Sequence, residues 1–96
     1  MNILSIGTNR TNYNLSVEDY VFKDIKDTTD ILEIQEIADS FFSYNNIGED
    51  TQINLYVTEN TLFTLAVVKS SIKAKCKLNC MHYISNLGCY IAQPML

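Results

Sequence analysis

The sequence predicts a small α/β fold in which a mostly parallel mixed sheet carries two main helices and ends in an antiparallel hairpin. Three observations lead to this expectation. Strand-like segments alternate with two segments of helical periodicity, a helix connects the third and fourth predicted strands, and a turn-rich tetrapeptide separates the last two. Strands joined by a helical crossover run parallel, and strands joined by a short turn run antiparallel.

The first half of the chain predicts two strands and a helix. Residues 1–6 are an apolar run that Gly7 closes, and residues 20–25 are a second strand candidate. Asp30, with Glu33 three residues later, is an N-cap signature. Apolar residues then recur at helical spacing, at Ile31, Ile34, Ile37, Ala38, Phe41 and Phe42. The opposite arc of this helix carries Glu33, Glu36 and Asp39, which form either a solvated face or an acidic docking surface.

The second half predicts a strand, a helix and a hairpin. Residues 52–57 form the strand, residues 58–61 a polar turn, and residues 62–76 the helix. Residues 77–84 and 89–92 are the hairpin strands, joined by a turn over residues 85–88. This order of elements is Rossmann-like in style, and with three glycines, one proline and no repeat we expect a single α/β domain over residues 1–96.

The helix over residues 62–76 has two apolar stripes. One stripe consists of Leu65, Val68, Ile72 and Cys76, and the other of Phe63, Val67 and Ala74, with Thr64, Ser71 and Lys75 between them. One stripe can cover the sheet, and the other must contact the first helix or a second copy of the protein. A homodimer is therefore expected as one way to bury it.

Charge and hydropathy exclude some classes of partner. The net charge is −4, which has the wrong sign for a protein that tracks the phosphates of duplex nucleic acid. Residues 1–68 hold all eleven acids and three bases, whereas residues 69–96 hold four lysines and no acid, so a small anion could still find a positive region. No apolar run is long enough for a membrane span and no secretory signal is visible, so we expect a cytoplasmic protein without a membrane partner.

The three cysteines, Cys76, Cys80 and Cys89, are an odd number without paired spacing, which predicts reduced thiols. A zinc site with His82 can be imagined, but the spacing differs from that of zinc ribbons and knuckles, so no metal is expected.

Two polar loops are the candidate ligand site. Ligands of open parallel sheets bind beyond the carboxyl ends of the strands. Two groups of residues follow predicted strands and would converge at that edge, namely Gly7, Thr8, Asn9 and Arg10 after the first, and Thr58, Glu59, Asn60 and Thr61 after the third. Arg10 is the only arginine, and its guanidinium matches phosphate oxygens, although it can equally be an ordinary surface residue.

Standard cofactor and catalytic motifs are absent from the sequence. The chain has no glycine-rich dinucleotide or P-loop motif, no G-x-S-x-G and no H-E-x-x-H, so no cofactor is expected. A stacking platform would also use the tyrosines, but basic residues do not interleave with them, which favours core-edge and interface positions.

Four segments together resemble the small stand-alone CRISPR-associated proteins with a CARF-like, Rossmann-like core. The segments are ILSIGTNRTN at residues 3–12, INLYVTENT at 53–61, MHYI at 81–84 and IAQP at 91–94. The resemblance implies a homodimer that binds or cleaves a cyclic oligonucleotide, with residues 8–10 in the first ligand loop and residues 58–61 in the second. Glu59 and Asn60 stand where the family has a glycine-rich loop, which argues against direct phosphate contact there.

Two functions remain open from the sequence. The first is a homodimeric, nucleotide-binding sponge or slow metal-independent ring nuclease for a cyclic oligonucleotide messenger in antiviral defence or viral counter-defence. In that case Arg10 is the best candidate for a catalytic residue, because a cation would stabilise charge on the phosphate during attack by the ribose 2′-hydroxyl. The second is a small acidic protein-interaction module, an inhibitor or accessory subunit, without a small-molecule ligand.

Overall fold

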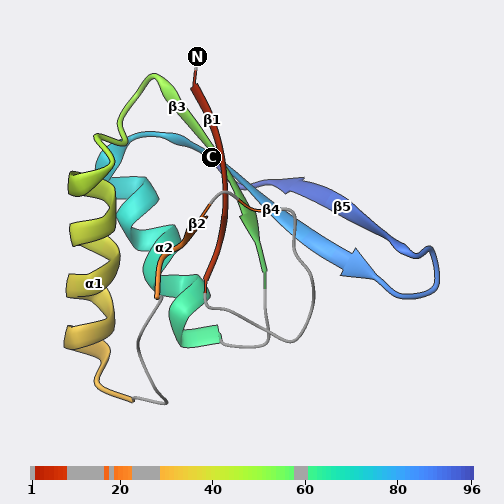
Figure 1. The fold of residues 1–96 in the computed structure, drawn as a ribbon, viewed down its shortest axis with the longest axis horizontal. Coiled ribbons are helices and arrows are strands. Elements are labelled where there is room, and N and C mark those ends of the chain that lie inside the picture. The colour runs from red at the N-terminus through yellow and green to blue at the C-terminus, as the bar shows by residue number, and fades with distance from the viewer. Residues whose placement is uncertain (1, 9–16, 18, 23–28, 58–60) are drawn as a thin grey trace.

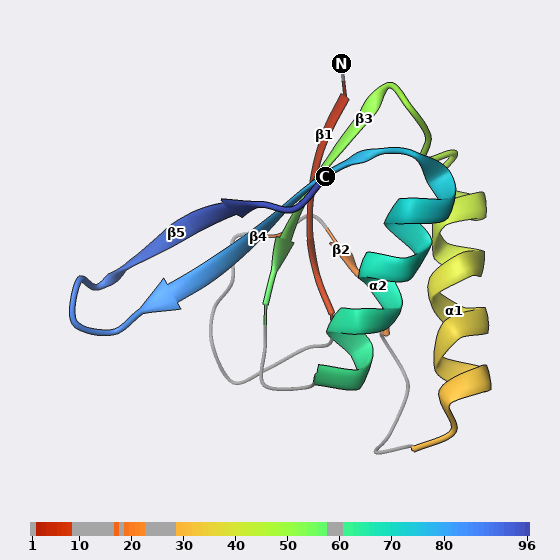
Figure 2. The ribbon, with the colours of Figure 1, turned by 180° about the vertical axis from the view of Figure 1, so that it is seen from behind.

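The computed structural model describes residues 2–8, 17, 19–22, 29–57 and 61–96. Five strands form one sheet, and two helices pack side by side on the same face of it (Figure 1). The predicted class, a small α/β fold with a mixed sheet, is confirmed. The view from behind shows the same two layers, with α2 closer than α1 to the strands (Figure 2).

The elements follow the predicted order. The strands are Asn2–Gly7 (β1), Asp19–Tyr20 (β2), Thr51–Tyr56 (β3), Lys77–Ile84 (β4) and Cys89–Pro94 (β5), and the helices are Ile31–Tyr44 (α1) and Thr61–Ala74 (α2). Their order across the sheet is β2-β1-β3-β4-β5. Strands β1 to β4 run parallel, and β5 pairs antiparallel with β4. The turn between β4 and β5 ends at Gly88, whose φ of 65° suits a residue without a Cβ.

Helix α1 begins where its sequence predicts. The Asp30 carboxylate accepts a hydrogen bond from the Glu33 backbone N–H at 3.2 Å, which confirms the N-cap. The helix buries Ile34, Ala38 and Phe42 and leaves Glu33 and Glu36 exposed. It therefore has the one-sided amphipathic character that the periodicity indicates.

The second strand differs from its prediction over residues 20–25. Among the described residues, Asp19 and Tyr20 pair with β1, opposite Ile6 and Gly7, and the N–H groups of Val21 and Phe22 donate to the carbonyls of Gly7 and Thr8 beyond this short ladder. Phe22, two residues after Tyr20, is buried and stacks on Phe63 of α2 with ring centroids 4.2 Å apart. Residues 23–28 lie outside the described part of the chain.

The two stripes of α2 have different environments. Phe63 and Val67 are buried, so this stripe closes the core against the sheet. Leu65 and Ile72 of the other stripe remain 55% and 57% exposed. Ser71, predicted in the polar arc, is fully buried. Its hydroxyl donates a hydrogen bond to the Val67 carbonyl at 2.8 Å, so the side chain can be buried without a water partner.

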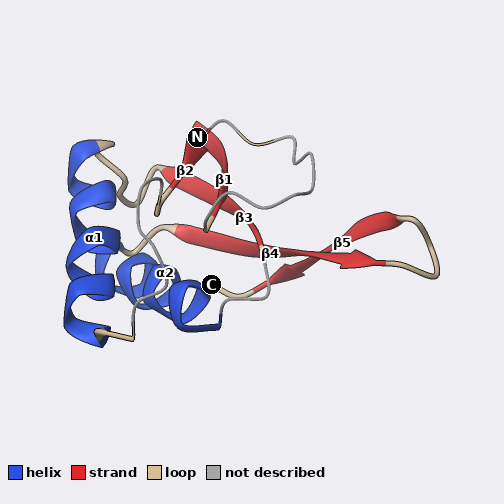
Figure 3. Ribbon diagram, turned by 60° about the horizontal axis from the view of Figure 1, so that its bottom comes forward, coloured by secondary structure: helices blue, strands red, loops and turns tan. Residues whose placement is uncertain are grey.

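The core lies between the helices and one face of the sheet. The central strands contribute Ile6, Ile53, Leu55 and Leu78 to it. The hairpin formed by β4 and β5 extends away from the helices (Figure 3), and Tyr83, Leu87 and Ile91 along it are exposed. None of the described helices is long and apolar enough to span a bilayer.

Candidate functional site

The carboxyl ends of β1 and β3 lie side by side. Gly7 pairs with Tyr56 in the parallel ladder, so the chain leaves both strands at the same edge of the sheet. After β1 the chain continues to β2 on one side, and after β3 it continues to β4 on the other. Such a reversal of strand order is where open α/β sheets form ligand crevices.

The described candidate residues at this edge differ in accessibility. Gly7 and Thr8 are buried, and their carbonyls accept hydrogen bonds from the N–H groups of Val21 and Phe22 at 3.1 and 2.8 Å. Thr61 is exposed and is the first residue of α2. Gly7 and Thr8 therefore shape the edge through their backbone, whereas Thr61 is accessible to a ligand.

The remaining candidates, Asn9, Arg10, Thr58, Glu59 and Asn60, lie outside the described residues. The adjacent strand ends, Gly7 and Tyr56, still fix where both candidate loops begin. The start of α2 adds backbone N–H groups with positive partial charge, and its first turn holds no acidic residue. The described part of this edge therefore includes the positive end of the α2 dipole.

A tyrosine cluster lies at the same end of the sheet, on the face without helices. We use this name for Tyr56 of β3, Tyr83 of β4 and Tyr90 of β5. The Tyr90 ring packs edge-on against Tyr56 and Tyr83, with centroid distances of 4.9 and 5.3 Å. Tyr83 is 57% exposed, and the other two are half-buried. From the sequence, the tyrosines were expected at core-edge and interface positions rather than on a stacking platform, and this grouping of three was not predicted. The turn over residues 85–88 already implies that Tyr83 and Tyr90 are cross-strand partners.

The environment of Tyr90 affects its ionisation. Burial raises the pKa of the Tyr90 hydroxyl, and the neighbouring Tyr56 and Tyr83 add to the increase. The Tyr90 hydroxyl therefore keeps its proton to a higher pH than an ordinary tyrosine does.

Three amide side chains continue the same face toward the other end of β3 and β4. The Asn54 carbonyl oxygen accepts hydrogen bonds from the side-chain amides of Gln52 and Asn79, at 3.3 and 3.2 Å. Lys77 is opposite Gln52 in the register and so shares this face. The helix-free face thus combines aromatic rings, amides and one cationic side chain.

The cysteines and the histidine occupy separate environments. Cys76 and Cys80 are buried, and burial raises the pKa of both thiols. His82 Nε2 is 2.8 Å from Gln93 Oε1 across the hairpin, and Cys89 is exposed. Among the described residues, no three histidine, cysteine or acidic side chains gather closely enough to hold a metal ion.

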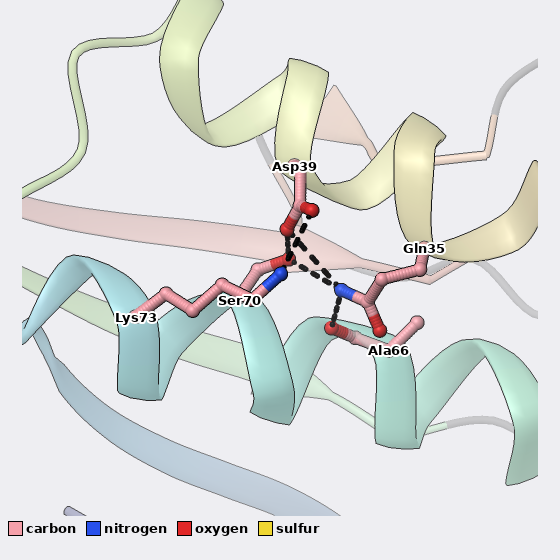
Figure 4. Close-up of polar contacts among 5 residues, drawn as sticks. All are labelled: Gln35, Asp39, Ala66, Ser70 and Lys73. Carbon is pink, nitrogen blue, oxygen red and sulfur yellow. Dashed lines mark hydrogen bonds and ion pairs between the residues drawn. The ribbon is translucent and has the colours of Figure 1, made fainter. Parts of the chain in front are cut away.

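A polar cluster joins the two helices and involves one of the acids of α1 (Figure 4). Asp39 accepts hydrogen bonds from the Ser70 hydroxyl at 2.7 Å and from the Lys73 ammonium at 3.0 Å. The Gln35 side-chain amide shares its two N–H groups among Asp39, Ser70 and the Ala66 carbonyl, with its nitrogen 3.1 to 3.2 Å from the three oxygens. These hydrogen bonds hold the pKa of Asp39 below its usual value, although its partial burial acts in the opposite direction. Asp39 therefore belongs to the helix contact, and Glu33 and Glu36 alone remain of the three acids considered for docking.

No protein-family model matches the chain, and neither the curated proteins nor the solved structures provide a match.

Proposed function

We propose that this protein is a homodimeric binder of an anionic cyclic oligonucleotide messenger, acting as a sponge or as a slow, metal-independent ring nuclease. The observation that supports this proposal is the pairing of Gly7 with Tyr56 at a reversal of strand order. It brings the starts of both candidate loops to one edge of the sheet. The resemblance of the sequence to CARF-like CRISPR-associated proteins points to the same edge and to antiviral defence or viral counter-defence in the cytoplasm.

The start of helix α2 supports an anionic ligand. The helix begins at the candidate edge with its positive end and without an acid in its first turn. This partial charge attracts phosphate groups despite the net charge of −4. The lysines after residue 68 are not its source, because Lys73 pairs with Asp39 and Lys77 begins β4 at the opposite end of the sheet.

Cleavage would need no cofactor. A ribose 2′-oxygen held in line with the adjacent phosphorus attacks it and loses its proton, the bond to the 5′-oxygen breaks, and that oxygen takes up a proton. The products are a 2′,3′-cyclic phosphate and a free 5′-hydroxyl. Arg10 is the candidate for stabilising the charge on the phosphate, and positioning of the ring supplies most of the acceleration.

Binding and ligand integrity with a panel of cyclic oligonucleotides test the proposal. A saturating ligand raises the melting temperature by roughly 10 °C at about a hundredfold excess over its Kd. Arg10→Ala removes most of this shift, whereas Lys69→Ala, which removes a positive charge from the exposed side of α2, preserves it. An unchanged melting temperature and intact ligand with every member of the panel would refute the proposal.

The second candidate function is a protein-interaction module without a small-molecule ligand. The observation that favours it is the exposure of large apolar side chains on both helices, Leu32 at 78% and Leu65 and Ile72 above 50%. A stoichiometric protein partner recovered from lysate, with binding weakened by Leu65→Lys and unaffected by Arg10→Ala, would favour this function over the messenger binder.

A further inference from the structure

The tyrosine cluster extends the candidate edge onto the helix-free face of the sheet. Tyr56 is the last residue of β3 and pairs with both Gly7 of β1 and Met81 of β4. Tyr83 is two residues beyond Met81, opposite Tyr90 of β5. The three rings therefore begin at the strand end that carries the candidate loop and continue outward along the hairpin.

We infer that the tyrosine cluster (Tyr56, Tyr83 and Tyr90) is a stacking surface for a purine base of the bound nucleotide. This inference rests on the proposed function, since it assigns the base of a ligand whose phosphates occupy the neighbouring edge. Aromatic side chains on an open sheet face are a recurring way to hold unstacked bases.

The packing of the rings suits a preformed surface. The edge-to-face contacts at 4.9 and 5.3 Å hold Tyr90 between its two neighbours, so little side-chain ordering is required when a ligand binds. Tyr83 is 57% exposed although a tyrosine is large and amphipathic. A base that stacks on it removes this apolar area from water.

The chemistry around the rings fits a nucleotide better than an apolar partner. Gln52, Asn54 and Asn79 supply amide donors and acceptors on the same face, which is what the polar edges of a base require. Lys77 lies on this face at the other end of β4, six residues before Tyr83, so the match depends on the rings and the amides. A planar, hydrogen-bonding base fits this combination.

Substitutions at Tyr83 test the inference with cyclic oligoadenylates as the probe. Tyr83→Leu keeps an apolar side chain but removes the ring, and it weakens binding by roughly 5- to 150-fold. Tyr83→Phe retains the ring and most of the affinity. The control is Tyr44→Leu, because Tyr44 is an 87% exposed tyrosine on α1. It leaves the affinity at the parent value. Unchanged thermal unfolding of the three variants without ligand verifies that they fold.

Two further measurements report directly on the rings. The chain has no tryptophan, so its intrinsic fluorescence comes from the tyrosines, and a stacked base quenches part of it. This quenching is smaller with Tyr83→Leu. A cyclic oligouridylate, whose bases stack less strongly, binds more weakly than the adenylate ring of the same size.

The outcomes separate the inference from the function on which it rests. If the parent binds an adenylate ring and Tyr83→Leu binds it equally well, the stacking surface is refuted and the proposed function remains. If linear and cyclic oligoadenylates bind with equal affinity, and this affinity falls with Tyr83→Leu but not with Arg10→Ala, the stacking surface remains and the messenger function fails. If neither ligand binds the parent, both fail, and a protein that binds the cluster instead refutes the stacking surface.

Discussion

The three thiols show how strongly position within the fold controls the chemistry of identical residues. Cys76 and Cys80 are 3% and 4% exposed, and burial raises the pKa of each. Cys89 starts β5 on the exposed hairpin. Since the thiolate is the reactive species, the three side chains should differ greatly in their reaction rates.

Thiol titration of the native protein with a disulfide reagent should therefore give one fast reaction and two slow ones. Cys89→Ser removes the fast reaction. The other two thiols react only as the core opens, and all three react at once in denaturant. Two or more fast reactions in the native parent would contradict the burial of Cys76 and Cys80.

Sequence patterns predicted the roles of some individual residues and not of others. The Asp30 cap was predictable because a local hydrogen bond to Glu33 forms it. The burial of Ser71 was not, since a serine hydroxyl that donates to its own helix can be buried at little cost, and polarity alone does not show this.

The contact between α1 and α2 depends on a polar cluster as well as on apolar packing. The Ser70 hydroxyl is buried and donates to Asp39, so removal of the carboxylate leaves a buried donor without its acceptor. The Asp39 side chain itself is 41% exposed, so its ion pair with Lys73 contributes little by itself.

Substitutions at Asp39 should reduce stability in a pH-dependent way. Asp39→Ala lowers the free energy of unfolding by about 1–3 kcal/mol at neutral pH, and Asp39→Asn, which retains an acceptor, by less. Because the pKa of Asp39 is lowered in the folded state, its contribution is complete above the ordinary aspartate pKa of about 4. The contribution is lost as the pH falls through the folded value.

Denaturant unfolding across this acidic range measures the effect. The parent should lose stability on acidification more steeply than Asp39→Asn. Glu36→Gln, at an exposed position of the same helix, should follow the parent. Parallel pH profiles for the parent and Asp39→Asn would contradict the role of Asp39.

Elements with one dominant pattern were predicted best. The apolar periodicity of α1 and the turn before β5 gave correct types and nearly correct ends. The described strand β2 overlaps its predicted range only at Tyr20, because a two-residue strand is defined by its pairing with β1, which is tertiary information. The two apolar stripes of α2 could be identified from the sequence, but not which of them packs on the sheet, which is the stripe with Phe63 and Val67.

At the scale of the whole molecule, the exposed stripe of α2 is the surface on which the proposed homodimer can be tested. Leu65 and Ile72 are more than half exposed, and covering them would bury apolar area that a lone protomer leaves in water. The other stripe, with Phe63, is already covered within the chain by Phe22. A dimer through α2 must therefore use Leu65 and Ile72.

The mass from light scattering should correspond to a dimer for the parent. Joint replacement of Leu65 and Ile72 by lysine should weaken the dimer by at least about a hundredfold, because burial of each apolar side chain contributes about 1.5–3 kcal/mol. Leu32→Lys, at the 78% exposed position on α1, is the control and should remain dimeric. A monomeric parent at high concentration would refute the dimer.

The topology was more predictable than the site. The helical crossover between β3 and β4 and the short turn before β5 determined the strand directions, and both were correct. The tyrosine cluster depends on the register of three strands, of which only the hairpin register can be inferred from a nearby turn. Arg10, Asn9 and residues 58–60 remain predictions from sequence.

The placement of β1 has a consequence for how the chain folds. Its main partner is β3, so the centre of the sheet requires contact between segments about fifty residues apart, Asn2 with Thr51 and Gly7 with Tyr56. Closing so long a loop costs entropy before any pairing repays it. During synthesis β1 must therefore wait for β3 to leave the ribosome, whereas the hairpin of β4 and β5 can form from neighbouring residues as soon as it emerges.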